Sequence, residues 1–474
     1  MADNQTEVIK QEINKAINFL GQNKFTEAEN TCLKIIGTHD NADAFHILSS
    51  IKIYQQEFEQ SIEYVKKSIE INSDNAGYHV TLGCAYSSMK DYKNSISAFE
   101  NAIKLNDNVA QVHFYLGESL RKLKKYNDAI SCFYKTLELS PEHTGAYMLL
   151  GVVYQEKKQF DLSIKSFEKC LEIMPNYAEA HLNLGLCYLL VGDYENGWRE
   201  YEWRRKIYPL SADQLKKEWS GQSLDNKTLL IIDEGSNENL IHFIRFAKDL
   251  KKDGCKIILR CNENVRSLMS MQEWIDDVNS ETEYPEHDYY IYIGSIMNVL
   301  KYNPNHHKQH FPYIKTDEKR HHCIKPNQVN IGLVLETDRA SNAHDDESVN
   351  SSFFVNIFKK EWNVIYLDNQ VDESNLPTCC NSLASYSDIK ELSQIINQLD
   401  LVITVDHLVG HISGALNIDT ILMLPCVPNW RWDMNHRSNS PWYESMHLFR
   451  QQIPDDWESV ITNVTKYLES GKYG

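Results

Sequence analysis

Residues 110–143 read AQVHFYLGESLRKLKKYNDAISCFYKTLELSPEH, and this stretch has close counterparts before and after it in the 474-residue chain. Its glycine belongs to a series whose members are 34 positions apart: Gly83, Gly117, Gly151 and Gly185. Large aromatic residues follow the same period in two further series, Phe58, Tyr92, Tyr126, Phe160 and Tyr194, and Phe99, Phe133, Phe167 and Tyr201. Several series that share one period and one phase indicate an array of repeated structural units.

A period of 34 residues is typical of tetratricopeptide (TPR) helix–turn–helix units, which this half of the chain resembles. The residue types fit that architecture. Glycine lets the two helices of a hairpin approach closely, the aromatic rings fill the space between hairpins, and prolines such as Pro141 end the second helix. The phase predicts six units, at 9–41, 42–75, 76–109, 110–143, 144–177 and 178–211. We therefore expect an α solenoid over residues 9–211.

A TPR solenoid predicts that the protein binds a partner in the concave groove formed by the first helices of the units. TPR-bearing peptide glycosyltransferases often line this groove with a ladder of asparagines. The equivalent positions here are Thr81, Tyr115, Leu149 and Asn183, of which one is asparagine. The sequence thus favours a protein partner, or a second copy of the chain, without such a ladder. The alternative is that the solenoid only orients the C-terminal half.

Composition limits the classes of function. The chain is 42% hydrophobic and 24% charged, as expected of a globular protein, and it has no apolar run long enough to cross a bilayer. Its start, Met1–Lys10, does not resemble a signal peptide, and its eleven cysteines lack metal-type spacing. A formal charge of −18 disfavours binding to nucleic acid. We expect a cytoplasmic protein with no membrane span, no metal and no cofactor.

The 34-residue period stops after Pro209, and short apolar segments then alternate with helical patterns. Strands are predicted near 228–233, 255–260, 289–293, 329–335, 363–367, 399–405 and 420–424. Strands separated by helices predict parallel sheets covered on both faces. The polar stretch Thr316–Gln328 divides this region, so we expect Rossmann-like lobes at 212–315 and 329–474, joined by a linker at 316–328.

Particular residues of the second half carry a resemblance. They are GWREYEWR at 197–204, Trp219-Ser220-Gly221, and the block Trp430–Gln451 with its Trp430-Arg431-Trp432 and Ser440-Pro441-Trp442-Tyr443. They resemble bacterial TPR proteins with a C-terminal heptosyltransferase-like domain. The resemblance implies a GT-B arrangement of two Rossmann-like lobes, and transfer of a sugar from a nucleotide-sugar to a protein or glycan acceptor.

In that family, the aspartate and histidine of an Asp-Thr-Ala-x-x-His motif lie beside the sugar-nucleotide. Asp406 and His411 match the motif, and His407 replaces its threonine. Because the carboxyl end of a strand and the start of a helix favour phosphate, the resemblance assigns Asp406, His407, His411 and Gly414 to donor binding. The alternative is that Asp406 caps the helix. For the nearby Trp430, Trp432, Trp442 and Tyr443, core packing is favoured over stacking on a ligand.

Two departures from the family concern catalysis. Relatives carry a Glu-Gln-Gly-Leu-Gly-Asp turn, whose aspartate is the presumed acceptor base, where this chain has Glu234-Gly235-Ser236-Asn237-Glu238-Asn239. An amide such as that of Asn239 cannot take a proton, which leaves Glu234 or Glu238 as the candidate base. Residues 336–349 contain five acidic residues and one arginine, a formal charge of −4 that would repel a diphosphate.

Two functions therefore stay open. The first is sugar transfer by an enzyme with weakened motifs. The second is a catalytically inactive transferase fold that acts as a scaffold for protein–protein interaction. An open pocket between the lobes would favour the first, and a pocket filled by protein side chains would favour the second.

Overall fold

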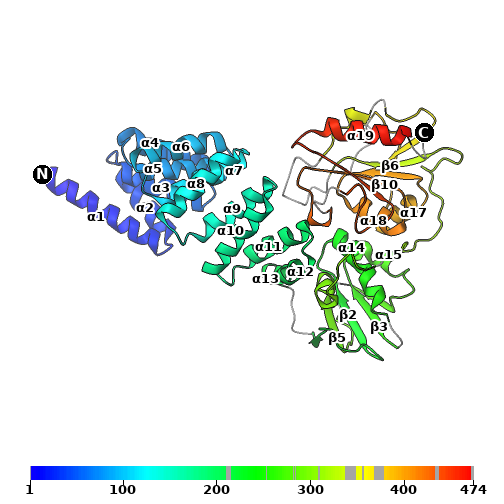
Figure 1. Ribbon diagram of the computed structural model, residues 1–474. Helices are drawn as coiled ribbons and strands as arrows, with labels where there is room; N and C mark the ends of the chain where they lie inside the picture. The colour runs from blue at the N-terminus through cyan, green and yellow to red at the C-terminus, as the bar shows by residue number, and fades with distance from the viewer. Residues whose placement is uncertain are drawn as a thin grey trace. The chain divides into compact units, whose positions relative to one another are not determined.

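The computed structural model describes residues 2–209, 215–251, 254–280, 282, 284–307, 310–336, 348–354, 357–367, 378–432 and 437–470 (Figure 1). The chain forms two compact units, Met1–Ala180 and His181–Gly474. In the described ranges no helix is both long enough and apolar enough to cross a membrane. All eleven cysteines lie in these ranges, and each carries a free thiol.

The first unit is a solenoid of antiparallel helix pairs, as Figure 1 shows. Its helices are α1 (Ala2–Gly21), α2 (Phe25–Ile36), α3 (Ala42–Tyr54), α4 (Phe58–Ile71), α5 (Ala76–Ser88), α6 (Tyr92–Leu105), α7 (Ala110–Lys122), α8 (Tyr126–Leu139), α9 (Thr144–Glu156) and α10 (Phe160–Ile173). Each predicted unit from 42 to 177 contains one such pair. A helical solenoid is therefore confirmed over these units, whereas most of the sixth predicted unit, 178–211, falls in the second compact unit.

The periodic glycines are explained by the aromatic rings that lie against them. A Cβ atom added at Gly83, Gly117 or Gly151 would come within 2.5, 2.7 and 2.5 Å of the rings of Phe99, Phe133 and Phe167 respectively. Those three rings are buried in the solenoid. The first helix of each pair therefore approaches the second closely enough that only hydrogen fits at the glycine.

The second unit begins with helices and continues into two parallel sheets. The helices are α11 (Ala178–Val191), which starts at the boundary between the units, α12 (Tyr194–Tyr201) and α13 (Arg204–Ile207). The first sheet has the order β1-β5-β2-β3-β4, with β1 (Lys217–Glu218), β2 (Thr228–Ile232), β3 (Lys256–Arg260), β4 (Asp277–Asn279) and β5 (Tyr289–Tyr292). Helices α14 (Asn237–Asp249), α15 (Glu263–Met269) and α16 (Ile296–Leu300) lie between and after these strands. We call this part the first-sheet module.

The second sheet has the order β11-β10-β9-β6-β7-β8, and its strands are also parallel. The strands are β6 (Asn330–Val334), β7 (Asn363–Tyr366), β8 (Ser382–Leu383), β9 (Leu401–Thr404), β10 (Thr420–Leu424) and β11 (Met446–Arg450). The helices are α17 (Ile389–Ile396), α18 (Leu408–Leu416) and α19 (Trp457–Ser470). We call this part the second-sheet module. The predicted α/β class with parallel sheets is confirmed.

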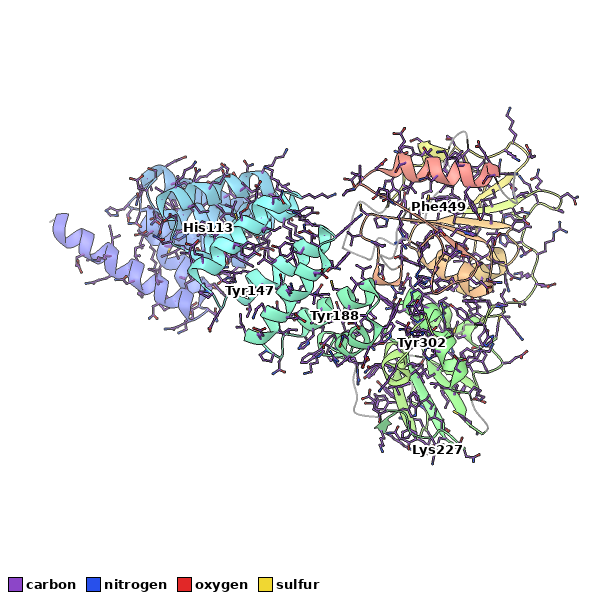
Figure 2. The ribbon with its side chains drawn as sticks, viewed as in Figure 1. His113, Tyr147, Tyr188, Lys227, Tyr302 and Phe449 are labelled. Atoms are coloured by element: carbon purple, nitrogen blue, oxygen red, sulfur yellow. The ribbon has the colours of Figure 1, made fainter. Side chains whose placement is uncertain are left out.

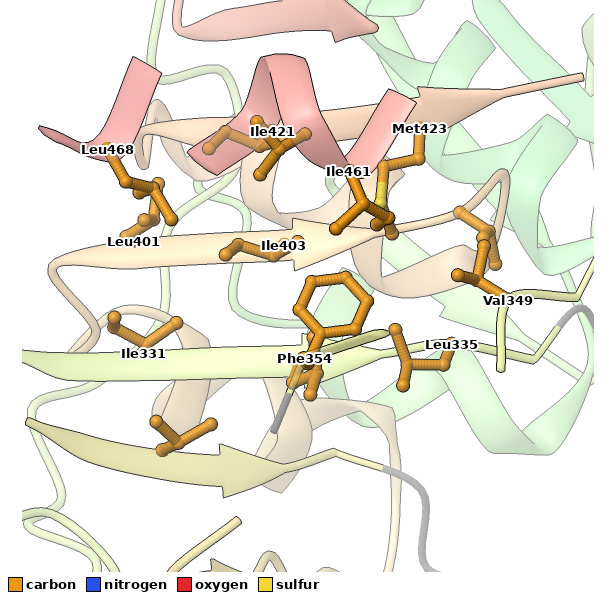
Figure 3. Packing of buried hydrophobic residues seen from close by; sticks show 14 of the residues in the cluster. Ile331, Leu335, Val349, Phe354, Leu401, Ile403, Ile421, Met423, Ile461 and Leu468 are labelled. Atoms are coloured by element: carbon orange, nitrogen blue, oxygen red, sulfur yellow. The ribbon is translucent and has the colours of Figure 1, made fainter. Parts of the chain in front are cut away.

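A continuous apolar core lies between one face of the second sheet and α19, and Figure 3 shows its packing. Ile331, Ile403 and Ile421 come from neighbouring strands, and Ile461 and Leu468 come from α19. The stretch 316–328 between the modules lies along α17. Ser393 donates a hydrogen bond to Thr316 (3.1 Å), and Gln398 donates one to the carbonyl of Lys319 (2.8 Å). The expected linker is thus bonded to the second-sheet module.

We predict that Gly151→Ala destabilises the solenoid. The new methyl group would overlap the buried ring of Phe167, and the cost of overpacking exceeds the gain in helix propensity. We expect the free energy of unfolding to fall by about 2 kcal/mol in urea denaturation followed by circular dichroism. Gly21→Ala is the control, because nothing lies within 4 Å of a Cβ atom there. The double variant Gly151→Ala, Phe167→Leu should recover part of the loss; a Gly151→Ala protein as stable as the native one would contradict the explanation.

Candidate functional site

The residues that the resemblance assigns to donor binding, which we call the donor motif, lie where β9 ends and α18 begins. Asp406 follows the strand directly, and His407 occupies the N-cap position of the helix. The Nδ1 atom of His407 accepts a hydrogen bond from the backbone N–H of Val409 at 3.1 Å. The helix is therefore capped by His407, so the alternative role of Asp406 as the cap is not the one observed. The side chain of Asp406 remains directed toward His411.

His411 lies in the first turns of α18 and is buried. Its Nε2 atom is 3.7 Å from Oδ1 of Asp406, and its Nδ1 atom is 2.7 Å from the hydroxyl of Tyr443. The ring of Trp432 stacks on the imidazole with 5.4 Å between centroids. The structure brings Asp406 and His411 together as the resemblance implied, and two aromatic side chains cover His411.

Tyr443 joins the two modules. Its hydroxyl lies 3.2 Å from Nδ1 of His242 in α14, in addition to its contact with His411. His242, His411 and Tyr443 are all buried. The ring of Tyr443 also explains Gly414, because a Cβ atom there would come within 2.3 Å of it. Gly414, predicted to bind the donor, lies beneath Tyr443.

Two buried guanidinium groups flank this contact. Arg245 of α14 donates to the backbone carbonyl of Trp442 and to the hydroxyl of Tyr313 (3.0 Å), and it lies 4.4 Å from the centroid of the Tyr443 ring. Arg431, in the 3-10 turn Trp430–Trp432, donates to the side-chain oxygen of Asn239 in α14. Each arginine thus makes a hydrogen bond from one module to the other.

The degenerate base position, Asn239, and the two candidate bases, Glu234 and Glu238, are placed differently. The amide oxygen of Asn239 is held by Arg431, so that position is part of the contact between the modules. Both carboxylate oxygens of Glu234 accept from the buried Arg204, at 2.8 and 3.0 Å, and one also accepts from the backbone N–H of Gly294 at 3.0 Å. We interpret Glu234 as a structural residue that ties α13 to the first-sheet module.

Glu238 accepts a hydrogen bond from Ser236 at 2.7 Å in the first turn of α14. Its negative charge is among the groups that raise the pKa of His411, which places it near the donor motif. The acidic stretch predicted to repel a diphosphate lies largely outside the described residues, since 337–347 are not among them. In the ranges that are described, no group of three or more His, Cys, Asp or Glu side chains could hold a metal ion.

An aromatic cluster surrounds the site, and sequence reasoning did not identify its centre. Trp198 of α12 is buried, and its indole N–H donates to the carbonyl of Tyr302 at 2.8 Å. Its ring lies 5.4 Å from that of Trp430 and 6.3 Å from that of Phe243. Figure 2 labels Tyr302 in this region. Core packing of Trp430, Trp432, Trp442 and Tyr443 is confirmed by their burial. Trp198 belongs to the GWREYEWR segment that carries the family resemblance, so the sequence offered a reason to consider it.

Burial and nearby charges set the ionisation of the site. Burial lowers the pKa of His242 well below its usual value, and the charges of Arg245 and Arg431 lower it further. Burial also lowers the pKa of His411. For Asp406, burial raises the pKa, but the hydrogen bond and charge of His411 and the charge of Arg431 outweigh it, so the net shift is downward. Near neutral pH we therefore expect two neutral imidazoles and an ionised carboxylate.

These ionisation states define a direction for the hydrogen bonds. The Nε2 atom of His411 carries the proton because it faces the carboxylate of Asp406. Its Nδ1 atom then accepts from the hydroxyl of Tyr443, whose oxygen accepts from Nδ1–H of His242. We name this chain of contacts, two hydrogen bonds from His242 through Tyr443 to His411 and the 3.7 Å approach of His411 to Asp406, the intermodule relay. It uses the donor motif to hold the two modules together.

Comparison with known proteins supports the repeats. Tetratricopeptide-repeat models match residues 110–143, and also 42–75, 76–109 and 144–177, which are the bounds predicted from the glycine period. Residues 42–177 are therefore TPR units. A search of curated protein sequences found no match to this chain.

Several solved structures are similar to part of this chain. MamA is 22% identical, and the match covers 33% of this chain and 92% of that one, with a TM-score of 0.32. YrrB, titled a TPR protein with an unusual peptide-binding site, is 22% identical, and the match covers 39% of this chain and 92% of that one, with a TM-score of 0.33. PilF of Pseudomonas aeruginosa is 17% identical, and the match covers 44% of this chain and 95% of that one, with a TM-score of 0.40.

We predict that the contact between the modules weakens in mild acid. Because the pKa values of His242 and His411 are lowered by folding, the unfolded chain binds more protons below the ordinary histidine pKa of about 6.5. The free energy of unfolding should therefore fall as the pH drops below about 6.5, by up to about 1.4 kcal/mol per pH unit for each group. Asp406, with its lowered pKa, adds a further loss only in stronger acid, below about 3.9.

Thermal unfolding between pH 7.5 and 5 measures this slope. The variant His242→Gln, His411→Gln should show a shallower slope, whereas His306→Gln, at an exposed position, should keep the native one. An unchanged slope in the double variant would show that the relay histidines do not set the pH dependence.

We predict that Asn239→Asp stabilises the protein instead of supplying a base. The new carboxylate would accept a charge-assisted hydrogen bond from Arg431, so the free energy of unfolding should rise by about 1 kcal/mol. Asn237→Asp is the matched control, because it adds the same charge to the first turn of α14 without facing Arg431. Equal stabilities of the two variants in urea denaturation would argue against the bond between Arg431 and residue 239.

Proposed function

We propose that this protein binds a protein partner through its TPR solenoid, and that its α/β part is a GT-B-like module that does not transfer sugar. The observation that carries the second statement is the occupied donor site. His411 is covered by Tyr443 and Trp432, and the acceptor-base position, Asn239, is bonded to Arg431 of the other module.

The backbone donors at the start of α18 are also engaged. A nucleotide-sugar would need free N–H groups there to bind its diphosphate. The N–H of Val409 is bonded to the ring of His407, and the N–H of Gly410 is bonded to the carbonyl of the same residue. These bonds favour a closed helix start over an anion site.

Opening the modules for a donor would break several buried hydrogen bonds together. They are the bonds of Tyr443 with His242, of Arg245 with the carbonyl of Trp442, and of Arg431 with Asn239. A buried polar group left without a partner costs about 1–3 kcal/mol, and a charged group costs more. A donor would have to supply this free energy in addition to its own binding. We therefore favour a scaffold over a transferase.

Sugar transfer from a nucleotide-sugar to a protein or glycan acceptor remains the second candidate, and one observation favours it. Asp406 and His411 lie side by side at the carboxyl end of β9, as in the family that the sequence resembles. In this alternative, Asp406 and His411 would contact the donor, and Glu238 would act as base, since its charge reaches His411. The Asn239→Asp variant would then gain transfer activity.

We also propose a cytoplasmic location. The support is chemical: all eleven cysteines carry free thiols, which a reducing compartment maintains.

Calorimetric titration of the full chain with UDP-, GDP- and ADP-sugars, with and without magnesium, tests the proposed loss of transfer. We expect no saturable heat with any of them, because the site is filled by Tyr443 and Trp432. The variants Asp406→Ala and His411→Ala should behave like the native protein in this assay. Glu361→Ala, at an exposed acidic position, is the control for a change of charge alone. Saturable binding that Asp406→Ala abolishes and Glu361→Ala retains would establish the transferase instead.

A further inference from the structure

The first helices of the third, fourth and fifth TPR units present a partly exposed apolar surface. Helices α5, α7 and α9 contact one another in order along the solenoid. Their half-buried apolar side chains pack on the solenoid core while keeping some exposure. We name this set the inner face: Val80 and Cys84 of α5, Phe114 and Tyr115 of α7, and Leu149 of α9. Half-buried apolar side chains such as these can bury more surface area when a partner chain lies over them.

One carboxylate lies within this apolar surface. Glu118 is half-buried on α7, one turn after Tyr115. Burial raises the pKa of the Cys84 thiol to about 11, and the charge of Glu118 adds to that shift. Burial also raises the pKa of Tyr115, and Glu118 is again one of the contributing charges. Cys84 lies 34 positions before Glu118, so the two residues hold the same place on the first helices, α5 and α7, of neighbouring units.

Glu118 has no cation of its own. The arginine one turn further along α7, Arg121, is bonded to Glu156 of α9 at 2.7 Å. In the part of the chain that the structure describes, Glu118 forms no ion pair and no hydrogen bond. A carboxylate that is partly removed from water without a counter-charge is stabilised when a cation reaches it, and the gain grows as the surroundings become more apolar.

We propose that the inner face binds an extended apolar segment of a partner protein that carries a lysine or arginine paired with Glu118. This inference rests on the proposed function of the solenoid as a protein-binding element, and it adds the chemistry of the partner. The apolar residues of the segment cover Val80, Phe114, Tyr115 and Leu149, and its cation neutralises the carboxylate between them. A segment with an acidic residue at that position would be repelled, so the same contact sets specificity.

Fluorescence anisotropy of the full chain with three labelled peptide pools tests the inference. The pools share degenerate apolar positions and differ only at the centre, which is lysine, glutamine or glutamate. We expect the lysine pool to bind most tightly and the glutamate pool to bind least. Glu118→Lys should lower the affinity for the lysine pool about tenfold or more and raise the affinity for the glutamate pool. Glu118→Gln should make the affinities for the three pools similar. Glu100→Lys is the matched control, because it makes the same charge change at an exposed position on α6, the second helix of the third unit.

The possible results distinguish the pairing with Glu118 from protein binding by the solenoid. A reversal of charge preference in Glu118→Lys, absent from Glu100→Lys, supports both. Equal binding of the three pools, unaffected by Glu118→Lys, overturns the pairing with Glu118 and leaves protein binding standing. Failure of every pool to bind the native chain overturns both. Circular dichroism of each variant confirms that the helices are intact, and Glu118→Gln, which keeps the shape of the side chain, gives the answer if Glu118→Lys does not fold.

Discussion

The hydroxyl of Tyr443, placed between the imidazoles of His242 and His411, is the contact on which the form of the α/β part depends. It lies in the protein interior, where a polar group must find partners among its neighbours. Its ring requires glycine at position 414, and the guanidinium of Arg245 lies against the same ring. The residues that resemble a substrate site therefore form the contact between the two modules. A tyrosine in this position explains at once why the modules are joined and why the donor motif is covered.

Sequence reasoning reached those features that depend on local or repeated patterns. The 34-residue period identified the solenoid because the series that contain Gly117 and Phe133 recur in four successive units. The Asp406–His411 spacing predicted that both residues lie at one strand end. It could not reach contacts between distant segments. The sequence leaves Glu234 as a candidate base, but in the structure its carboxylate is bonded to Arg204 of α13, and Asn239 pairs with Arg431, 192 positions away. Periodicity predicts which face of an element is apolar, but not which side chain of another element will meet it.

Particular polar groups of the two units differ in whether a partner within the chain satisfies them. In the α/β part, Asp406, Glu234 and Asn239 are satisfied from within the chain, by histidine or arginine. In the solenoid, Glu118 is half-buried and has no such partner among the residues that the structure describes. Groups already bonded favour a rigid body, and an unbonded charge on a half-buried surface favours recognition of something external. The same contrast separates a structural module from a binding surface in the function proposed for this protein.

The position of Trp198 has a consequence for the order in which the protein matures on the ribosome. The helices of residues 42–177 bury their rings against neighbours that are close in sequence, so they can form as soon as they emerge. The hairpin that carries Trp198 belongs to the other unit and packs against Trp430 and Trp442, which are translated more than two hundred codons later. During synthesis the indole must therefore wait for about half of the chain before these two tryptophans are made. The interval offers chaperones an apolar segment to hold, and a nascent chain that stalls before the last tryptophans would keep its repeats while leaving this hairpin without a core.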